Sequence, residues 1–143
     1  MDQIWIIFAL LSAASAALVA IFGKIGLTGL DTNTATAIRA VIMALFLIGV
    51  IIVQGKLAEI RTIISSSRAL FFIILSGIAG AVSWLFYFLA LKNAKVSQVV
   101  PIDRLSVVFA LVLAFLFLGE KISLKAGIGA ALVVAGGILI ALG

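Results

Sequence analysis

Two charged residues, Asp103 and Arg104, follow the chain's single proline, Pro101, inside a stretch that is otherwise apolar enough to cross a membrane. Charges in hydrocarbon are costly, so ionisable residues within a span pair, face a protein interior or line a water-filled path. An aspartate can carry a proton or bind a cation, whereas arginine N–H groups suit carboxylate and phosphate. The pair therefore indicates a solute path, with Asp103 as the candidate coupling-ion site.

Two further basic residues, Lys24 and Arg39, are expected to approach the same membrane face as Asp103. Adjacent helical residues diverge by about 100°, so Asp103 and Arg104 cannot both face one partner. We expect Asp103 to pair with Arg39 or Lys24, which leaves Arg104 or Arg39 to contact a substrate carboxylate or phosphate. The alternative is structural: the basic side chains extend to the headgroups and one carboxylate neutralises one of them.

Pro101 predicts a kink in the helix that carries these charges. Proline lacks the N–H that would bond to the carbonyl of Ser97, and its ring crowds the preceding turn. Backbone groups freed at membrane depth need protein or water as partners. A kink, a freed carbonyl and two charges close together are typical of the interrupted helices at transporter binding sites.

Aromatic residues near the end of the third apolar segment are candidates for a pocket wall. Trp84, Tyr87 and Phe88 share one helical face, and the faces of aromatic rings attract cations. The alternative is the belt of aromatic residues that lies at the membrane interface. Trp84 and Tyr87 are the residues we assign to the candidate substrate pathway.

The composition predicts an all-α membrane protein. Of 143 residues, 66% are hydrophobic and 10% are charged, against about half and about a quarter in soluble domains, and the mean hydropathy is +1.46. Crossing a membrane takes about 20 largely apolar residues. We therefore expect a bundle of five transmembrane helices in one domain of residues 1–143, with a short interfacial helix between the second and third spans in 54–68. The predicted spans are residues 4–22, 35–53, 69–91, 97–118 and 122–142.

Several function classes are disfavoured. The chain has no cysteine and no histidine, which removes thiolate and imidazole metal ligands and a Ser-His-Asp relay. Nothing arranges a nucleophile beside a base, so we expect no enzyme, no metal site and no cofactor. The net charge of +5 comes from basic residues dispersed at span ends. That placement suits a lipid bilayer and not a nucleic acid.

The basic residues barely favour one orientation in the membrane. With five spans, the side of the N-terminus receives five basic residues and the opposite side three, or four if Arg39 reaches outward. The two sets are Lys56, Arg61, Arg68, Lys121 and Lys125, and then Lys24, Lys92 and Lys95. Because orientation follows the lysine and arginine bias, near balance predicts that copies insert both ways round.

The C-terminal third resembles a known family. Pro101, the run Leu-Gly-Glu-Lys-Ile-Ser-Leu at 118–124, Gly127, and the run Gly-Gly-Ile-Leu-Ile at 136–140 resemble the closing helices of an EamA domain of the drug/metabolite transporter superfamily. Residues 87–91, Tyr-Phe-Leu-Ala-Leu, resemble the approach to its fourth helix. The resemblance implies a carrier or exporter of small organic metabolites in a prokaryotic inner membrane. A single domain of five helices resembles a half-transporter, completed by a homodimer of oppositely inserted copies.

Two departures limit what the resemblance implies. The short multidrug-resistance members of the superfamily have an essential glutamate in their first helix, whereas residues 4–22 contain no acid. Their exchange of protons for drugs therefore does not transfer to this chain. Asp103 and Arg104 also make the fourth span more charged than is usual for an EamA domain. The alternative function is a lipid-linked flippase subunit, or a non-transporting membrane scaffold that needs a partner.

Overall fold

The computed structural model describes residues 3–143, and residues 1 and 2 of the predicted domain lie outside this range. The described part consists of helices joined by short turns and loops, without strands, and five stretches are long and apolar enough to cross a membrane, as predicted. Four of them are single helices: α1 (Ile4–Gly26), α2 (Thr32–Val53), α4 (Ser67–Asn93) and α7 (Leu124–Leu142). The fourth span in chain order consists of three segments: α5 (Val96–Asp103), α6 (Ser106–Leu113) and the π-helical turn η1 (Ala114–Leu118).

Polar caps set two helix ends that hydropathy alone misplaces. The helix α2 begins at Thr32 and not at residue 35, because the Asp31 carboxylate accepts hydrogen bonds from the Thr34 N–H at 2.8 Å and the Thr34 hydroxyl at 2.7 Å. The helix α7 begins two residues later than predicted, because the Ser123 hydroxyl oxygen accepts from the Ala126 N–H at 3.1 Å. Such caps satisfy N–H groups that the first helical turn leaves without partners.

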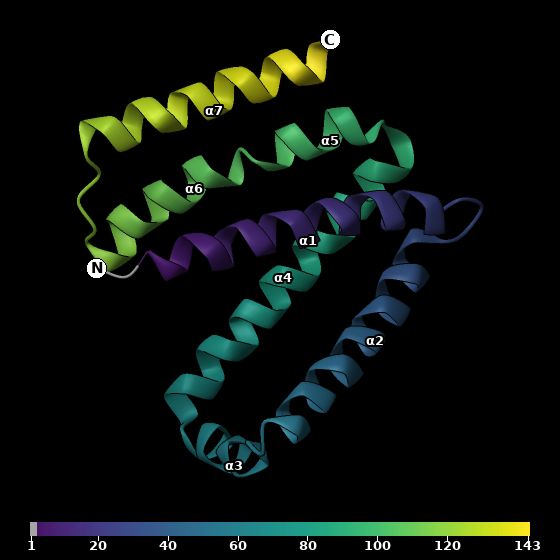
Figure 1. Ribbon diagram of the computed structural model, residues 1–143, viewed down its shortest axis with the longest axis vertical. Coiled ribbons are helices and arrows are strands. Elements are labelled where there is room, and N and C mark those ends of the chain that lie inside the picture. Colours follow the sequence, from purple (N-terminus) through teal and green to yellow (C-terminus); the bar gives the residue numbers. More distant parts are fainter. Residues whose placement is uncertain (1–2) are drawn as a thin grey trace. The chain divides into compact units, whose positions relative to one another are not determined.

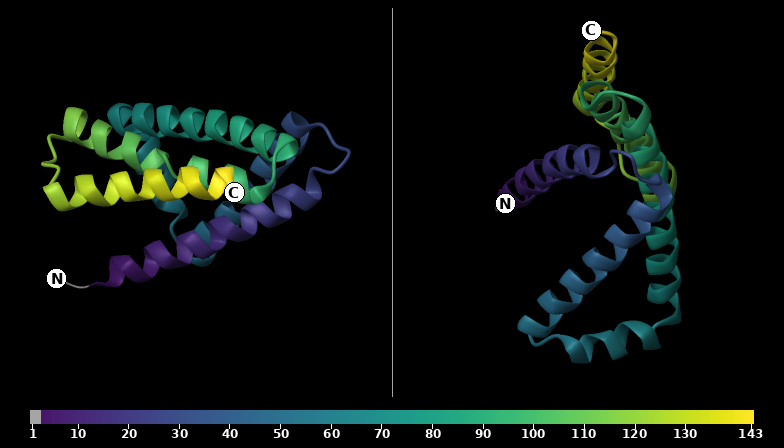
Figure 2. Two further views of the ribbon diagram at one scale, coloured as in Figure 1. Left: turned by 90° about the horizontal axis from the view of Figure 1, so that it is seen from above. Right: turned by 90° about the vertical axis from the view of Figure 1, so that its right-hand side faces the viewer.

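The described residues form two compact units. One combines the residues up to Ile25 with Asn93–Gly143, and the other is Gly26–Lys92. In the first unit, α5 packs along α7, and Figures 1 and 2 show the two helices side by side. Gly137 of α7 is buried there, and a β-carbon at this position would lie only 2.9 Å from the Pro101 carbonyl oxygen. The absence of a side chain is therefore what lets the two backbones approach.

In the second unit, α2 and α4 converge where α2 begins and α4 ends, and they separate toward the other end (Figure 1). The separated ends are joined by α3 (Leu57–Ser65), the short helix predicted between the second and third spans. At the converging end, Lys92 Nζ donates to the Leu30 carbonyl oxygen at 3.4 Å.

Apolar side chains cover the outside of every predicted span. Within residues 3–143 the buried apolar side chains are Ala20, Leu27, Phe88 and Leu91, while large residues such as Phe46 and Phe86 are exposed. In water such a surface would be unstable, but hydrocarbon is as apolar as the side chains themselves. The exposed faces therefore suit lipid or another membrane helix.

Candidate transport site

The fourth span is interrupted beside the charges that the sequence singled out. The helix α5 continues through Pro101 to Asp103, and α6 starts again at Ser106 (Figure 1). Across the break, the Leu105 N–H donates to the Ile102 carbonyl at 3.0 Å and the Val107 N–H to the Arg104 carbonyl at 3.1 Å. These tighter bonds span three residues and not four. The kink was expected at Pro101, and the break in the helix begins three residues after it.

The two charges at the break have different surroundings. Asp103, the last residue of α5, is half-buried, whereas Arg104 is exposed. Lys24, one of the two partners expected for Asp103, donates from Nζ to the Ala94 carbonyl oxygen at 2.8 Å. The other expected pair, Asp103 with Arg39, would join the two units and stays a prediction.

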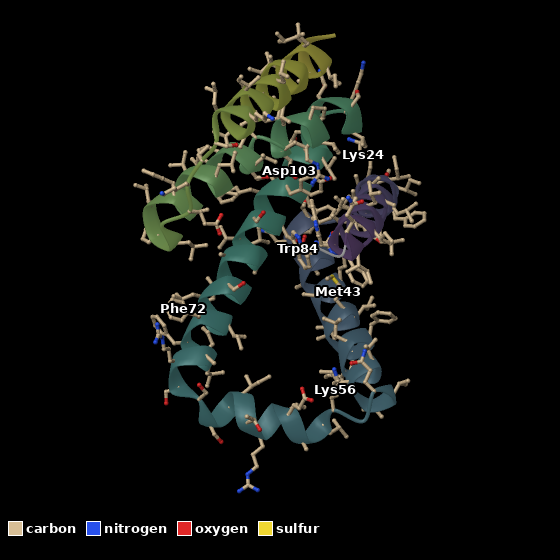
Figure 3. All side chains as sticks on the ribbon, turned by 60° about the vertical axis from the view of Figure 1, so that its left-hand side comes forward. Lys24, Met43, Lys56, Phe72, Trp84 and Asp103 are labelled. Atoms are coloured by element: carbon tan, nitrogen blue, oxygen red, sulfur yellow. The ribbon has the colours of Figure 1, made fainter. Side chains whose placement is uncertain are left out.

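In the second unit, Arg39 lies against two aromatic rings of α4. Its Cζ atom is 3.6 Å from the ring centroid of Phe88 and 4.7 Å from that of Trp84. Phe88 is fully buried and meets Tyr87 edge-on, with 5.2 Å between ring centroids. Figure 3 shows Trp84 between α4 and α2, whereas Phe72, lower on α4, points away from α2. The rings hold the guanidinium through the attraction of a cation to the negative ring face.

The helix spacing explains why these residues meet. Thr32, Thr36 and Arg39 recur at intervals of four and three, so they share one face of α2, and Trp84 and Phe88 are four apart on α4. Along this α2 face the Thr36 hydroxyl donates to the Thr32 carbonyl at 2.8 Å. Arg39 lies seven residues after Thr32, roughly 10 Å along the helix at a rise of about 1.5 Å per residue. A line of polar side chains thus runs into the apolar part of α2.

The guanidinium of Arg39 is held by the rings but not satisfied by them. Its Nε and Nη2 atoms are buried, and neither has a hydrogen-bond partner among the described residues. A buried donor without a partner costs about 1–3 kcal/mol, and more when charged, whereas a desolvated cation–π contact contributes about 2 kcal/mol. The rings stabilise the charge of the guanidinium but accept no hydrogen bond, so both nitrogens remain able to bind an acceptor.

Comparison with known proteins identifies the kind of protein to which this arrangement belongs. Residues 3–142 match the EamA-like transporter family. The chain belongs to this family. It is also 40% identical, over 141 residues that cover 99% of both chains, to a Sinorhizobium protein named "Uncharacterized transporter in cobO 3'region". No solved structure matches the chain. This EamA-family protein is a multi-pass membrane transporter.

The EamA-family chain brings together some of the predicted site residues and not others. Arg39 and Trp84 meet in one unit, with Tyr87 beside them. Lys24, Asp103 and Arg104 belong to the other unit. Phe88, which makes the shorter contact with Arg39, was considered for the pocket wall with Trp84 and Tyr87 but was not assigned to the pathway. The helical spacing placed these rings on one face, but it did not indicate that the ring of Phe88 makes the closest contact with the guanidinium.

Proposed function

We propose that the chain is a secondary transporter that moves small organic metabolites across a prokaryotic inner membrane by alternating access. The observation that carries the proposal is the break in the fourth span between α5 and α6, beside the half-buried carboxylate of Asp103. Interrupted spans expose backbone groups that bind ions and substrates near the midplane of transporters. A passive membrane anchor has no need for a costly break and a carboxylate at this depth.

We assign the coupling site to Asp103 in this proposal. A carboxylate in a span can exist protonated or ionised, so binding and release of a proton changes its charge as the path opens to either side. Its neighbour Arg104 is exposed and remains open to a substrate, a carbonyl or a second subunit. In this proposal Asp103 carries the coupling proton or cation, and Lys24 and Arg104 lie along the pathway.

We further propose that two copies inserted in opposite orientations form the working transporter. Many transporters are built from two repeats of inverted topology with the substrate site at their interface, and one chain with five spans supplies one such repeat. The near balance of basic residues between the two membrane sides supports insertion both ways round. The exposed apolar faces of the helices give the second copy a surface to pack against.

The test is a transport assay in which the cargo need not be known beforehand. The purified chain is reconstituted into liposomes with a pH gradient and incubated with a pool of organic acids, amines and amino acids, and the vesicle contents are measured by mass spectrometry. The wild type should accumulate at least one compound above protein-free vesicles. Asp103→Asn should fall to the protein-free level with unchanged insertion, because the variant cannot carry the proton.

Glu120→Gln is the matched control, because Glu120 is an exposed carboxylate in the loop between η1 and α7. This variant should transport like the wild type. Equal transport by Asp103→Asn would reduce Asp103 to a structural residue. No accumulation by folded wild-type protein would argue against self-sufficient transport and for the flippase-subunit or scaffold alternative.

A further inference from the structure

We propose that Arg39, held between Trp84 and Phe88, binds a carboxylate or another oxyanion group of the transported solute. The inference rests on the transport function proposed above and names the chemical class of the cargo: an organic anion or zwitterion with an apolar part. The site lies wholly within the unit Gly26–Lys92. It is formed by one side chain from α2 and two from α4.

The two unpartnered nitrogens of Arg39 form one edge of its guanidinium. The Nε–H bond and one Nη2–H bond point the same way, and this fork matches the two oxygens of a carboxylate. Both atoms are buried and have no hydrogen-bond partner in residues 3–143. The neighbouring rings cannot serve, since Phe has no acceptor atom and the Trp indole nitrogen only donates. The site therefore lacks two acceptor oxygens in the arrangement that a carboxylate supplies.

The rings indicate what else the solute carries. Cζ of Arg39 lies 3.6 Å from the Phe88 ring centroid and 4.7 Å from the Trp84 ring centroid. These contacts hold the guanidinium in place, so less entropy is lost when an anion binds. The ring edges beside the fork also offer an apolar surface to the remainder of the ligand. An anion with an aromatic or aliphatic part fits both features better than a bare inorganic ion.

The burial of Nε and Nη2 of Arg39 is consistent with a transport site. Because Nε and Nη2 are out of contact with solvent, an oxyanion reaches them only after the side chains around them move. Alternating access requires such opening and closing at the substrate site. A lipid phosphate offers the same oxyanion chemistry, so the experiment separates the two sources.

The experiment uses Trp84 as a reporter of binding. The chain has two tryptophans, so Trp5→Phe leaves Trp84 as the single fluorophore beside Arg39. The full chain in neutral detergent is titrated with benzoate and with benzamide, a neutral molecule of the same shape. Benzoate should change the emission saturably, and benzamide should bind about tenfold more weakly or worse, because it cannot accept a charge-assisted pair of hydrogen bonds.

Three variants in the same background test the role of the fork. Arg39→Gln should abolish the benzoate response, and Arg39→Lys, which keeps the charge but not the fork, should weaken it by about tenfold. Arg61→Gln removes an exposed arginine from the short helix α3, which the proposed pathway does not include, and should bind like the parent. Circular dichroism and gel filtration check folding, and Arg39→Lys keeps the test decisive if Arg39→Gln does not fold. Equal responses to benzoate and benzamide, or an unchanged response in Arg39→Lys, would overturn the proposal.

Lipid nanodiscs identify the source of the oxyanion. Emission of Trp84 is compared in phosphatidylcholine and in phosphatidylglycerol, each with and without benzoate. For a solute site, benzoate should act equally in both lipids. An Arg39-dependent shift caused by phosphatidylglycerol alone, with the benzoate response lost, would assign the site to a lipid and overturn the solute assignment.

Binding and transport can fail independently in these measurements. Benzoate binding that depends on Arg39, without flux of any compound in liposomes, would contradict the transport function but not the oxyanion site. Flux that depends on Asp103, without binding that depends on Arg39, would contradict the present inference and leave the transport function standing.

Discussion

Asp31 and Arg39, both in the first part of the second unit, differ in whether their charged groups have hydrogen-bond partners. Asp31 is exposed, and its carboxylate accepts hydrogen bonds from the N–H and the hydroxyl of Thr34. Arg39 lies deeper, against rings that accept no conventional hydrogen bond. The first arrangement satisfies the charge and stabilises a helix end, whereas the second leaves N–H donors for a ligand. Residue type alone does not distinguish these roles.

The cap at Asp31 predicts a pH dependence of stability. Donation from the Thr34 N–H, then from its hydroxyl, lowers the pKa of Asp31 below its ordinary value of 3.8, and Lys92 acts in the same direction. Since the folded-state pKa is the lower one, the cap stabilises the fold fully above about pH 4 and loses this effect as the pH falls through the folded-state pKa. Asp31→Ala should therefore lower the unfolding temperature at pH 7, and the difference from wild type should shrink toward pH 3.

Thermal unfolding in detergent, followed by circular dichroism between pH 7 and pH 3, measures this difference. Asp31→Asn is the control, because its side-chain oxygen can still accept from the Thr34 N–H but carries no charge to titrate. A difference between Asp31→Ala and wild type that stays constant over this range would show that the carboxylate charge plays no part in the cap.

At the scale of elements, the contact of α5 with α7 depends on one missing side chain. The Pro101 carbonyl oxygen would lie 2.9 Å from a β-carbon at Gly137, which is closer than β-carbons approach other heavy atoms in proteins. Because this oxygen is a backbone atom, it cannot rotate away as a side chain could. The Leu105 N–H, one turn further on, donates to Ile102 and not to Pro101. The close approach of α7 at Gly137 therefore lies next to the break in the fourth span.

Gly137→Ala should force α5 and α7 apart. We expect a loss of about 1–3 kcal/mol from overpacking, of which the better helix propensity of alanine offsets up to about 1 kcal/mol. The measurement is the unfolding temperature or the denaturant midpoint of the purified protein in detergent. The net effect should be destabilising, since a shift of the backbone is required.

Gly127→Ala is the matched control in the same helix, because no atom lies within 4 Å of its β-carbon position. It should leave stability unchanged or slightly raised. Equal effects of the two substitutions would mean that helix propensity, and not the approach of Pro101 to Gly137, decides stability here.

At the scale of the whole molecule, one copy leaves most of its apolar surface exposed, which is consistent with the proposed dimer of oppositely inserted copies. The absence of cysteine allows orientation to be measured directly. Single cysteines are introduced at Ser66 and at Asn93, which are exposed at the two ends of α4. Intact cells are then labelled with a thiol reagent that does not cross the membrane.

Partial labelling of both single-cysteine variants is the expected result, because copies in both orientations present each site to the outside. A second reagent, added after the cells are opened, should label the remainder of each variant and serves as the control for accessibility. Complete labelling of one variant and none of the other would establish a fixed orientation. The transporter would then need a parallel dimer or a different partner protein.

The number of spans, the short helix α3 and the charged residues within the spans could all be predicted from the amino-acid sequence. Length and hydropathy suffice for these features, because a bilayer demands about 20 apolar residues in each crossing. Hydropathy misplaced the starts of α2 and α7 by two or three residues, since it does not register the caps at Asp31 and Ser123.

Which helix faces meet could not be predicted from the sequence and follows from the packing of the helices. In the structure, Arg39 contacts Phe88 as well as Trp84, Lys24 donates a hydrogen bond to the Ala94 carbonyl, and Gly137 lies against Pro101. The physical reason is that an apolar helix in lipid has no solvent-facing side to fix its rotation about its own axis. Side-chain packing and hydrogen bonding between helices fix that rotation, and through it the surroundings of each charge.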